Sequence, residues 1–284
     1  MPSKDTDLVA SYWTLAGNID PGSTATASPW PFADRVAAAA DAGYAGFGIR
    51  HTDLAAVRSS VGLERMREIL DQGGMRHVEL EVLIDWFADG DRRALSDRVR
   101  AEMLEAAVVL GARHIKITAD RAAQPWPTDT YVEEFRRLCE EFEPTSTLVV
   151  LEPIPMTGIP DLRSALEIVT AADAPNGGLA VDIWHMERAG VPNEEIAAAP
   201  PDLVKFVEVN DAPATSEPAT WADTFTSRTL CGDGEFDIPG FLAAIDSIGY
   251  SGPIGVEIIG DEHRRRDLTT AAQAAIASAL KYLA

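Results

Sequence analysis

The sequence has few cysteines and no apolar segment that approaches the length of a transmembrane helix. Cys139 and Cys231 are the only two cysteines among 284 residues, and they form no Cys-x-x-Cys pair. A disulfide framework is therefore not expected, and a reducing compartment fits this composition. The first five residues also lack the basic and then apolar pattern of a signal peptide. These absences lead us to expect a soluble cytoplasmic protein.

Basic residues are scarce as well. Lysine and arginine together number 24, against 45 aspartate and glutamate residues, which gives a formal net charge of −21. Proteins that bind nucleic acid need a basic surface to neutralise phosphates, so this balance argues against a nucleic-acid partner. It also argues against binding at a membrane surface. Solubility explains the acidic surface at least as well as a cationic partner does.

Three common catalytic signatures are missing too: a glycine-rich phosphate loop, a nucleophile elbow and a dinucleotide-binding fingerprint. What the sequence does have is the composition of a globular protein, with 46% hydrophobic and 24% charged residues. A chain of 284 residues can bury a large core, either as one α/β barrel or as two ordinary domains.

Strand-like apolar runs alternate with helical segments along the chain. The expected strands are 10–15, 44–49, 77–84, 114–118, 148–151, 178–181, 204–207 and 253–256. The expected helices are 34–42, 63–72, 95–110, 131–142, 162–171, 194–198, 239–248 and 268–283, with a loop at 17–31 and an irregular stretch at 212–237. Such alternation predicts parallel βαβ units. Eight of them in this length predict a single (β/α)8 TIM barrel over residues 1–284.

An acid follows each of the last four expected strands: Glu152, Asp182, Glu208 and Glu257. Burying a charged side chain is costly unless it is paired or binds a metal ion. In a TIM barrel the active site gathers at the carboxyl ends of the strands, so the four carboxylates should converge there. They would repel one another unless they were protonated or bridged by a cation. Because oxygen ligands suit hard ions, we predict that these four acids bind one divalent ion, Mg²⁺ or Mn²⁺ before Zn²⁺.

Other interpretations of the residues near the strand ends stay open. Any one of the four acids, taken alone, could cap a helix or lie in a surface loop. Glu79 and Glu81 share one face of the third strand. Glu81 could lie behind the metal ligands and support them, or it could form a structural ion pair with Arg50 or Lys116. Three tryptophans could wall a pocket for a sugar ring or other cyclic substrate, or could fill the core: Trp13, Trp86 and Trp184.

Five short motifs connect the sequence to a known family. They are Leu151-Glu152-Pro153, Asp182-Ile183-Trp184-His185, Val207-Glu208-Val209-Asn210-Asp211, Arg228 with Gly232-Asp233-Gly234, and Gly255-Val256-Glu257. Through these motifs the chain resembles the xylose isomerase-like TIM-barrel superfamily, in its sugar phosphate isomerase/epimerase branch. The resemblance covers most of the chain and is densest from Glu152 onward. Its motifs are more specific for the superfamily than for a substrate.

The resemblance implies that Glu152, Asp182 and Glu257 are three of four metal ligands. The fourth ligand in the family is usually a histidine, and sometimes a glutamine, in a pattern close to His-x-x-Asp. This sequence has Glu208 at that position. The exchange adds a negative charge and removes the one nitrogen ligand, which leaves the identity of the metal open.

Two further residues match positions that have roles in the family. His185 corresponds to a histidine that contacts substrate oxygens near the metal; the alternative is a loop histidine with local hydrogen bonds. Arg228 opens a stretch that resembles the family's Arg-x-x-x-Gly-x-Gly pattern. Its guanidinium can stabilise an enediolate or bind a substrate carboxylate, and the alternative is a solvated surface arginine.

These residues together predict a divalent-metal-dependent isomerase or epimerase of a keto-sugar, a polyol or a cyclic hydroxy-ketone. The metal would bind a carbonyl and its neighbouring hydroxyl, and Glu152 and Glu257 would remove and return the proton between them. Expulsion of a β-hydroxyl from the same enediolate would instead make the protein a dehydratase. A non-catalytic barrel subunit stays open because Glu208 stands in the histidine position, and a homo-oligomer stays open as well.

Overall fold

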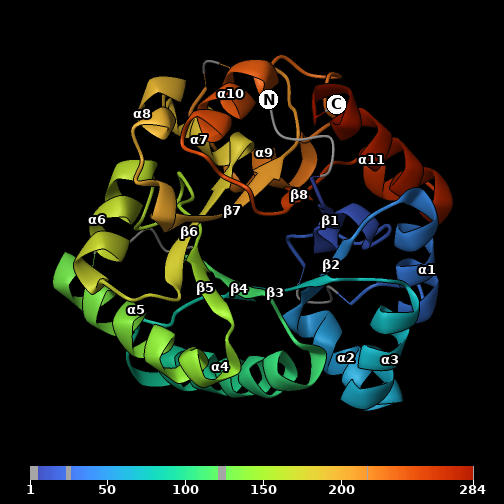
Figure 1. Cartoon of the computed structure of the whole chain (residues 1–284), viewed down its shortest axis with the longest axis horizontal. Helices are drawn as coiled ribbons and strands as arrows, with labels where there is room; N and C mark the ends of the chain where they lie inside the picture. The colour runs from blue at the N-terminus through green and yellow to red at the C-terminus, as the bar shows by residue number, and fades with distance from the viewer. Residues whose placement is uncertain (1–5, 24–26, 121–125, 216, 284) are drawn as a thin grey trace.

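The computed structural model describes residues 6–23, 27–120, 126–215 and 217–283. Within these ranges eight parallel strands pair in sequence order, and β1 pairs with both β2 and β8 to close a barrel. Figure 1 shows the strands around the centre of the molecule and the helices outside them. The structure therefore confirms the predicted (β/α)8 barrel. Residues 24–26 of the predicted loop at 17–31 lie outside the described residues.

The strands are short and buried on both faces, inside the barrel and beneath the helices, as is usual for parallel sheets. This double burial explains why continuous apolar runs in the sequence locate most of them. The strands are β1 (Leu8–Ala10), β2 (Gly46–Arg50), β3 (His77–Leu83), β4 (His114–Ile117), β5 (Leu148–Leu151), β6 (Gly177–Asp182), β7 (Val204–Val209) and β8 (Ile254–Val256).

Helices follow the strands and form the outer ring, in which α11 packs beside α1 (Figure 1). The α-helices are α1 (Phe32–Ala42), α2 (His51–Val61), α3 (Leu63–Gln72), α4 (Gly90–Leu110), α5 (Thr128–Phe142), α6 (Leu162–Ala172), α7 (Ile183–Ala189), α8 (Asn193–Ala197), α9 (Trp221–Thr226), α10 (Ile238–Ser247) and α11 (Leu268–Leu283). Four 3-10 helices complete the set: η1 (Tyr12–Leu15), η2 (Glu143–Thr145), η3 (Pro201–Leu203) and η4 (His263–Arg265). None of the described helices is both long and apolar enough to span a membrane.

The start of the barrel differs from the prediction. The expected strand over residues 10–15 is wrong, because Tyr12–Leu15 form the 3-10 helix η1. The neighbouring strand β8 ends at Val256, so no ladder partner continues beyond that point. Instead the hydroxyl of Thr14 donates to the carbonyl of Val256 at 2.6 Å and accepts from the N–H of Ile258 at 2.9 Å. These two bonds fold the segment across the end of β8.

Three helices were not predicted: α2, α7 and α9. The segment after Asp182 was expected to be a loop, but it forms α7. The Asp182 carboxylate accepts a hydrogen bond from the N–H of Trp184 at 2.6 Å and so caps this helix. α9 lies within the stretch at 212–237 that was expected to be irregular, and the hydroxyl of Thr220 caps it.

The barrel interior has an apolar layer beneath a polar one. Val9, Val150, Ala180 and Phe206 come from four different strands and pack on one another in a cluster separate from the main core. The main core lies between the strands and the helices. Further along three of these strands, towards their carboxyl ends, the inward-facing side chains become acidic: Glu152 at β5, Asp182 at β6 and Glu208 at β7. The fold thus places the acids above an apolar floor, where water has little access to them.

A buried ion pair between the first two helices gives a test of this packing. Arg35 and Asp53 are each about 1% exposed and lie 2.6 Å apart, and Asp53 also accepts from the N–H of Ser28 at 2.9 Å. Removing one partner leaves a buried charge uncompensated, so Asp53→Ala should lower the free energy of unfolding by about 3–5 kcal/mol. Urea denaturation measures this change.

The matched control is the exposed pair between Arg65 and Glu68 on α3. Exposed pairs contribute little, so Glu68→Ala should change the free energy of unfolding by less than about 1 kcal/mol. Equal losses in the two variants would contradict the role assigned to the buried pair.

Candidate active site

The four predicted acids meet at the carboxyl ends of the strands. Asp182 is the last residue of β6, Glu208 lies near the end of β7, and Glu152 and Glu257 directly follow β5 and β8. Each offers one carboxylate oxygen within 4.8 Å of the other three, and all four side chains are buried. None of them is a surface charge. Asp182 does cap a helix, as the alternative proposed, but it does so from inside the cluster.

Two more acids from β3 join this group. Glu79 and Glu81 point into the barrel and are buried as well. Burial, together with repulsion from the neighbouring acids, raises the pKa of Glu79, Glu81 and Glu152 above the ordinary value. The same causes raise the pKa of Glu208 to about 8. In the absence of an ion, these four glutamates therefore hold protons more tightly than separate carboxylates would.

Lys116 lies at the centre of these acids. Its side chain projects from β4 into the barrel and is about 1% exposed. The distances from Nζ to the nearest carboxylate oxygen are 2.8 Å for Glu208, 3.1 Å for Glu257, 3.2 Å for Glu81, 3.3 Å for Glu79 and 3.8 Å for Glu152. Burial opposes the charge, but the surrounding acids outweigh it and hold the pKa of Lys116 well above its usual value.

The contact with Glu81 confirms one of the two ion pairs predicted for that residue. The place of Lys116 in the site itself was not predicted. The available signal was its position two residues after His114 in a four-residue strand, which places both side chains on one face.

Arg228 is the second cation of the cluster. Its Nη1 donates to Asp182 at 2.6 Å and to Glu257 at 2.8 Å, and the side chain is buried. The alternative of a solvated surface arginine is therefore wrong. Burial lowers the pKa of Arg228, but the two acids outweigh this and raise it. The guanidinium also lies over the ring of Trp184, with 5.3 Å between its carbon and the ring centroid.

A close backbone approach holds Arg228 in this place. Its N–H donates to the carbonyl of Ile259 at 3.1 Å, in the segment that follows β8. A Cβ atom on Gly260 would lie 2.0 Å from the carbonyl oxygen of Arg228. Only glycine permits this contact, because any side chain would push the two segments apart.

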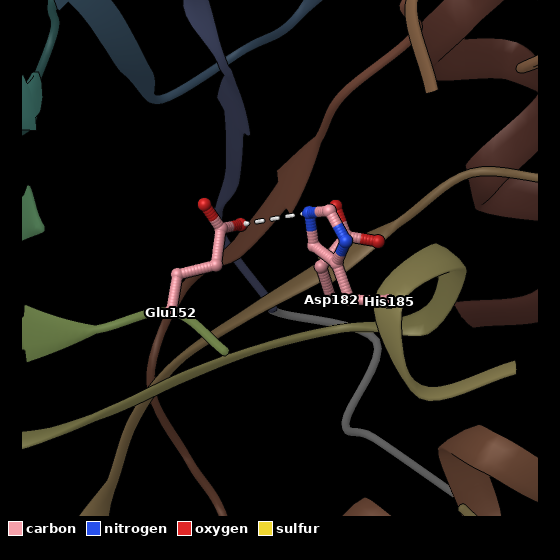
Figure 2. A group of neighbouring side chains, drawn as sticks. All are labelled: Glu152, Asp182 and His185. Atoms are coloured by element: carbon pink, nitrogen blue, oxygen red, sulfur yellow. Dashed lines mark ion pairs between the residues drawn. The ribbon is translucent and has the colours of Figure 1, made fainter. Parts of the chain in front are cut away.

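His185 lies in the first turn of α7 and faces the acids. Figure 2 shows it beside Glu152 and Asp182, and its Nε2 is 3.7 Å from Oε1 of Glu152. Its Nδ1 makes no hydrogen bond to the described residues. Burial and the neighbouring Arg228 hold the pKa of His185 well below its usual value, so the ring is neutral at pH 7. A neutral ring can accept a hydrogen bond or bind a metal ion through nitrogen.

A cavity of about 390 Å³ opens above the cluster. Its base includes Glu81, Glu152, His185, Arg228 and Glu257. Asp182, Glu208 and Lys116 are not among the described residues that line it. Its volume is that of a pocket for a small molecule.

Aromatic and aliphatic side chains form much of the cavity wall. Trp13 lines it, together with Ile154, Trp221, Phe225 and Ile259. Trp86 and Trp184 do not, although both were candidates for the wall. Trp86 is buried against other rings, and its Nε1 donates to the carbonyl of Thr118 at 2.9 Å.

The carboxylate oxygens of the cluster and the ring nitrogen of His185 are atoms of the type that bind divalent ions. Oε1 of Glu152 is buried and accepts no hydrogen bond from the described residues, so it lacks the partner that a buried carboxylate requires. Glu152 and Asp182 belong to two groups that could hold an ion, one completed by Glu208 and Glu257 and the other by His185. Both oxygens of Glu208 accept from Lys116, and Oε1 also accepts from the hydroxyl of Ser11 at 2.6 Å. An ion on Glu208 would share its oxygen with the lysine.

Comparisons with known proteins agree with the barrel fold. The model of a family described as xylose isomerase-like TIM barrel matches residues 36–283. Over 103 residues the chain is 34% identical to a 3-dehydroshikimate dehydratase of Pseudomonas aeruginosa, a match that covers 36% of this chain and 16% of that protein. Over 247 residues it is 24% identical to a 2-oxo-tetronate isomerase of Pectobacterium atrosepticum, with 80% and 86% covered.

A solved structure has the same fold. It is described as the IolI protein with a bound zinc atom, and it superposes with a TM-score of 0.83 at 20% identity over 98% of each chain. At this identity the likeness shows a shared fold. The chain spans only about a sixth of the dehydratase that it matches.

The raised pKa values predict how the ion-free protein responds to pH. A carboxyl group whose pKa is higher in the folded chain than in the unfolded chain stabilises the fold while it is protonated. For Glu208 this stabilisation is complete below the ordinary value of 4.5 and is lost as the pH rises towards about 8. We expect the free energy of unfolding in EDTA to fall between about pH 5 and about pH 8, as measured by urea denaturation.

Glu208→Gln provides the control, because the amide has nearly the same shape and does not titrate. The free energy of unfolding of the variant should fall less steeply than that of the parent over the same pH range. The difference should be up to roughly 1.4 kcal/mol for each pH unit. Identical pH profiles for the parent and the variant would show that the pKa of Glu208 is not raised.

Proposed function

Because the chain belongs to the xylose isomerase-like TIM-barrel family, we propose that it is a divalent-metal-dependent isomerase or epimerase. Its substrate would be a keto-sugar, a polyol or a cyclic hydroxy-ketone. The observation that carries this proposal is that Glu152 and Glu257 both line one small cavity, on top of an acidic cluster suited to an ion. The ion would be Mn²⁺ or Mg²⁺, held by Glu152, Asp182, Glu208 and Glu257.

Such an ion, when bound, polarises a substrate carbonyl and makes the neighbouring C–H more acidic. The chain supplies the groups that move the proton. Glu152 lines the cavity, and its Oε1 accepts no hydrogen bond from the described residues, so this oxygen is available to take a proton. Glu257 is held by Lys116 at 3.1 Å and by Arg228 at 2.8 Å. One of the two acids removes the proton and the other returns it.

Arg228 and His185 would act on the substrate oxygens. The guanidinium of Arg228 is fixed by two acids and borders the cavity, so it can stabilise the negative charge of an enediolate without reorganising. His185 is neutral and borders the same cavity, so it can exchange hydrogen bonds with a hydroxyl group. Return of the proton to the opposite face gives epimerisation, and return to the other carbon gives isomerisation.

A dehydratase is the second candidate. Of the two curated relatives described above, the dehydratase has the higher identity, although the match is short. The same first step, removal of a proton beside a carbonyl, would serve both reactions. The outcome then depends on whether the enediolate loses a β-hydroxyl before the proton returns.

Metal binding should be visible as added stability. An ion that binds only the folded chain at about 100 times its dissociation constant stabilises it by about 2.7 kcal/mol, or roughly 5 °C in melting temperature. Titration with Mn²⁺ or Mg²⁺ should raise the melting temperature by this amount, and EDTA should reverse the shift. The absence of any shift with several divalent ions would contradict a metal site.

Glu152→Gln tests the position of the ion. Oε1 of Glu152 accepts no hydrogen bond from the described residues, so the nearly isosteric amide should leave the fold stable. The variant should lose most of the metal-induced shift. A full shift in Glu152→Gln would place the ion away from this residue.

Proton exchange tests the chemistry. Metal-loaded protein in D₂O should exchange the proton beside the carbonyl of its substrate, and a panel of keto-sugars, 2-oxo-tetronate and 3-dehydroshikimate covers the proposed classes. Glu257→Gln should slow this exchange by about 100-fold or more, because it removes a proton-transfer group and keeps its shape. Nuclear magnetic resonance measures the exchange. Glu68→Gln, an exposed change on α3, should keep the parent rate.

The product separates the candidates. An isomerase or epimerase leaves the product mass unchanged apart from deuterium, whereas a dehydratase loses water and forms a conjugated product that absorbs ultraviolet light. A metal-loaded protein that exchanges no proton in any member of the panel would favour the non-catalytic barrel.

A further inference from the structure

Lys116 has more acidic neighbours than an ordinary ion pair requires. Five carboxylates lie within 3.8 Å of its Nζ, and all of them are buried inside the barrel. Oε1 of Glu79 is aimed at this nitrogen from 3.3 Å and forms no hydrogen bond to the described residues. A single ammonium group surrounded by acids in this way occupies the position that a bound cation would take.

We propose that the Lys116 ammonium fills a second cation position beside the proposed metal site, and that it limits the protein to one divalent ion. The proposal rests on the proposed function only for the first ion. The lysine position itself rests on the contacts described above.

Some acids contact both the Lys116 ammonium and the proposed metal position, and the others contact only one of the two. Glu79 and Glu81 contact Lys116, whereas Asp182 is held by Arg228 instead. Glu152, Glu208 and Glu257 belong to both positions, and Oε1 of Glu257 accepts from Lys116 at 3.1 Å while its Oε2 accepts from Arg228 at 2.8 Å. The lysine position therefore lies towards β3 and the metal position towards β6.

The net charge of the cluster depends on the Lys116 ammonium. Six acids meet two cations in this cluster, Lys116 and Arg228, so four negative charges remain if every acid is ionised. One divalent ion leaves two of them. Without Lys116 an additional negative charge would remain, together with a space lined by carboxylate oxygens. Such a space attracts a second hard cation.

The arrangement also has a consequence for the active site. An ammonium carried by the chain is always present, so Glu208 and Glu257 stay in place whether or not an ion is bound. Lys116 is thus a positioning residue for Glu257 at the base of the cavity and for Glu208 beneath it.

The test removes the ammonium and counts the ions. Lys116→Met keeps a flexible side chain of similar length, and it should bind one more equivalent of Mn²⁺ than the parent, measured by elemental analysis after gel filtration and by calorimetry. Saturating Mn²⁺ should raise its melting temperature by about 5 °C more than it raises that of the parent. Lys281→Met on the exposed face of α11 also removes one positive charge, and it should keep the parent stoichiometry.

Each outcome decides one of the two proposals. Equal stoichiometry in Lys116→Met and in a parent that binds one ion would overturn the lysine position and leave the proposed function intact. One ion in the variant and none in the parent would support the lysine position and contradict the metal in the proposed function. If Lys116→Met is recovered unfolded, Mn²⁺ should restore its fold. Failure of Mn²⁺, Mg²⁺ and Ca²⁺ to do so would overturn the inference.

Discussion

Mutual repulsion among buried carboxylates is the constraint on which the candidate site depends. Six acids enter the barrel from five strand ends, above an apolar layer that offers them no hydrogen bonds. Lys116 and Arg228 hold them together, each in contact with more than one acid. Since an uncompensated buried charge is costly, the positions of these two cations decide which arrangements of the acids are stable. The negative charge that remains is the charge that the proposed divalent ion would offset.

The site has two levels with different tasks. Glu152, Glu257, His185 and Arg228 border the cavity and can reach a substrate. Glu79, Glu208 and Lys116 lie beneath them and are closed off from it. The upper level has groups of the kind that can move a proton or stabilise an oxyanion. The lower level contacts the upper one through Lys116, which donates to Glu257.

Glu208 stands where the family usually has a histidine, and the structure shows how its neighbours accommodate it. The resemblance to the family leads one to expect a neutral histidine at this position, and a carboxylate adds a charge to a cluster that is already acidic. In the structure this charge is met by Lys116, which donates to both oxygens, and by the hydroxyl of Ser11. His185 meanwhile brings a ring nitrogen close to Glu152 and Asp182. A nitrogen atom is thus available to an ion from α7, although β7 has none to offer.

The alternation of apolar runs and helical segments was enough to predict the barrel and the meeting of the four acids. The parallel strands of a barrel all end at the same rim. An acid at the end of each of four strands therefore lies at that rim, independently of the conformation of the loops. The sequence did not reveal the centre of the cluster. Lys116 and Glu208 are separated by 92 positions in the chain, and only closure of the barrel brings β4 opposite β7. Likewise η1 and the cap of α7 depend on where a neighbouring strand ends or a carboxylate lies. Such contacts leave no local pattern, because the partners come from distant segments.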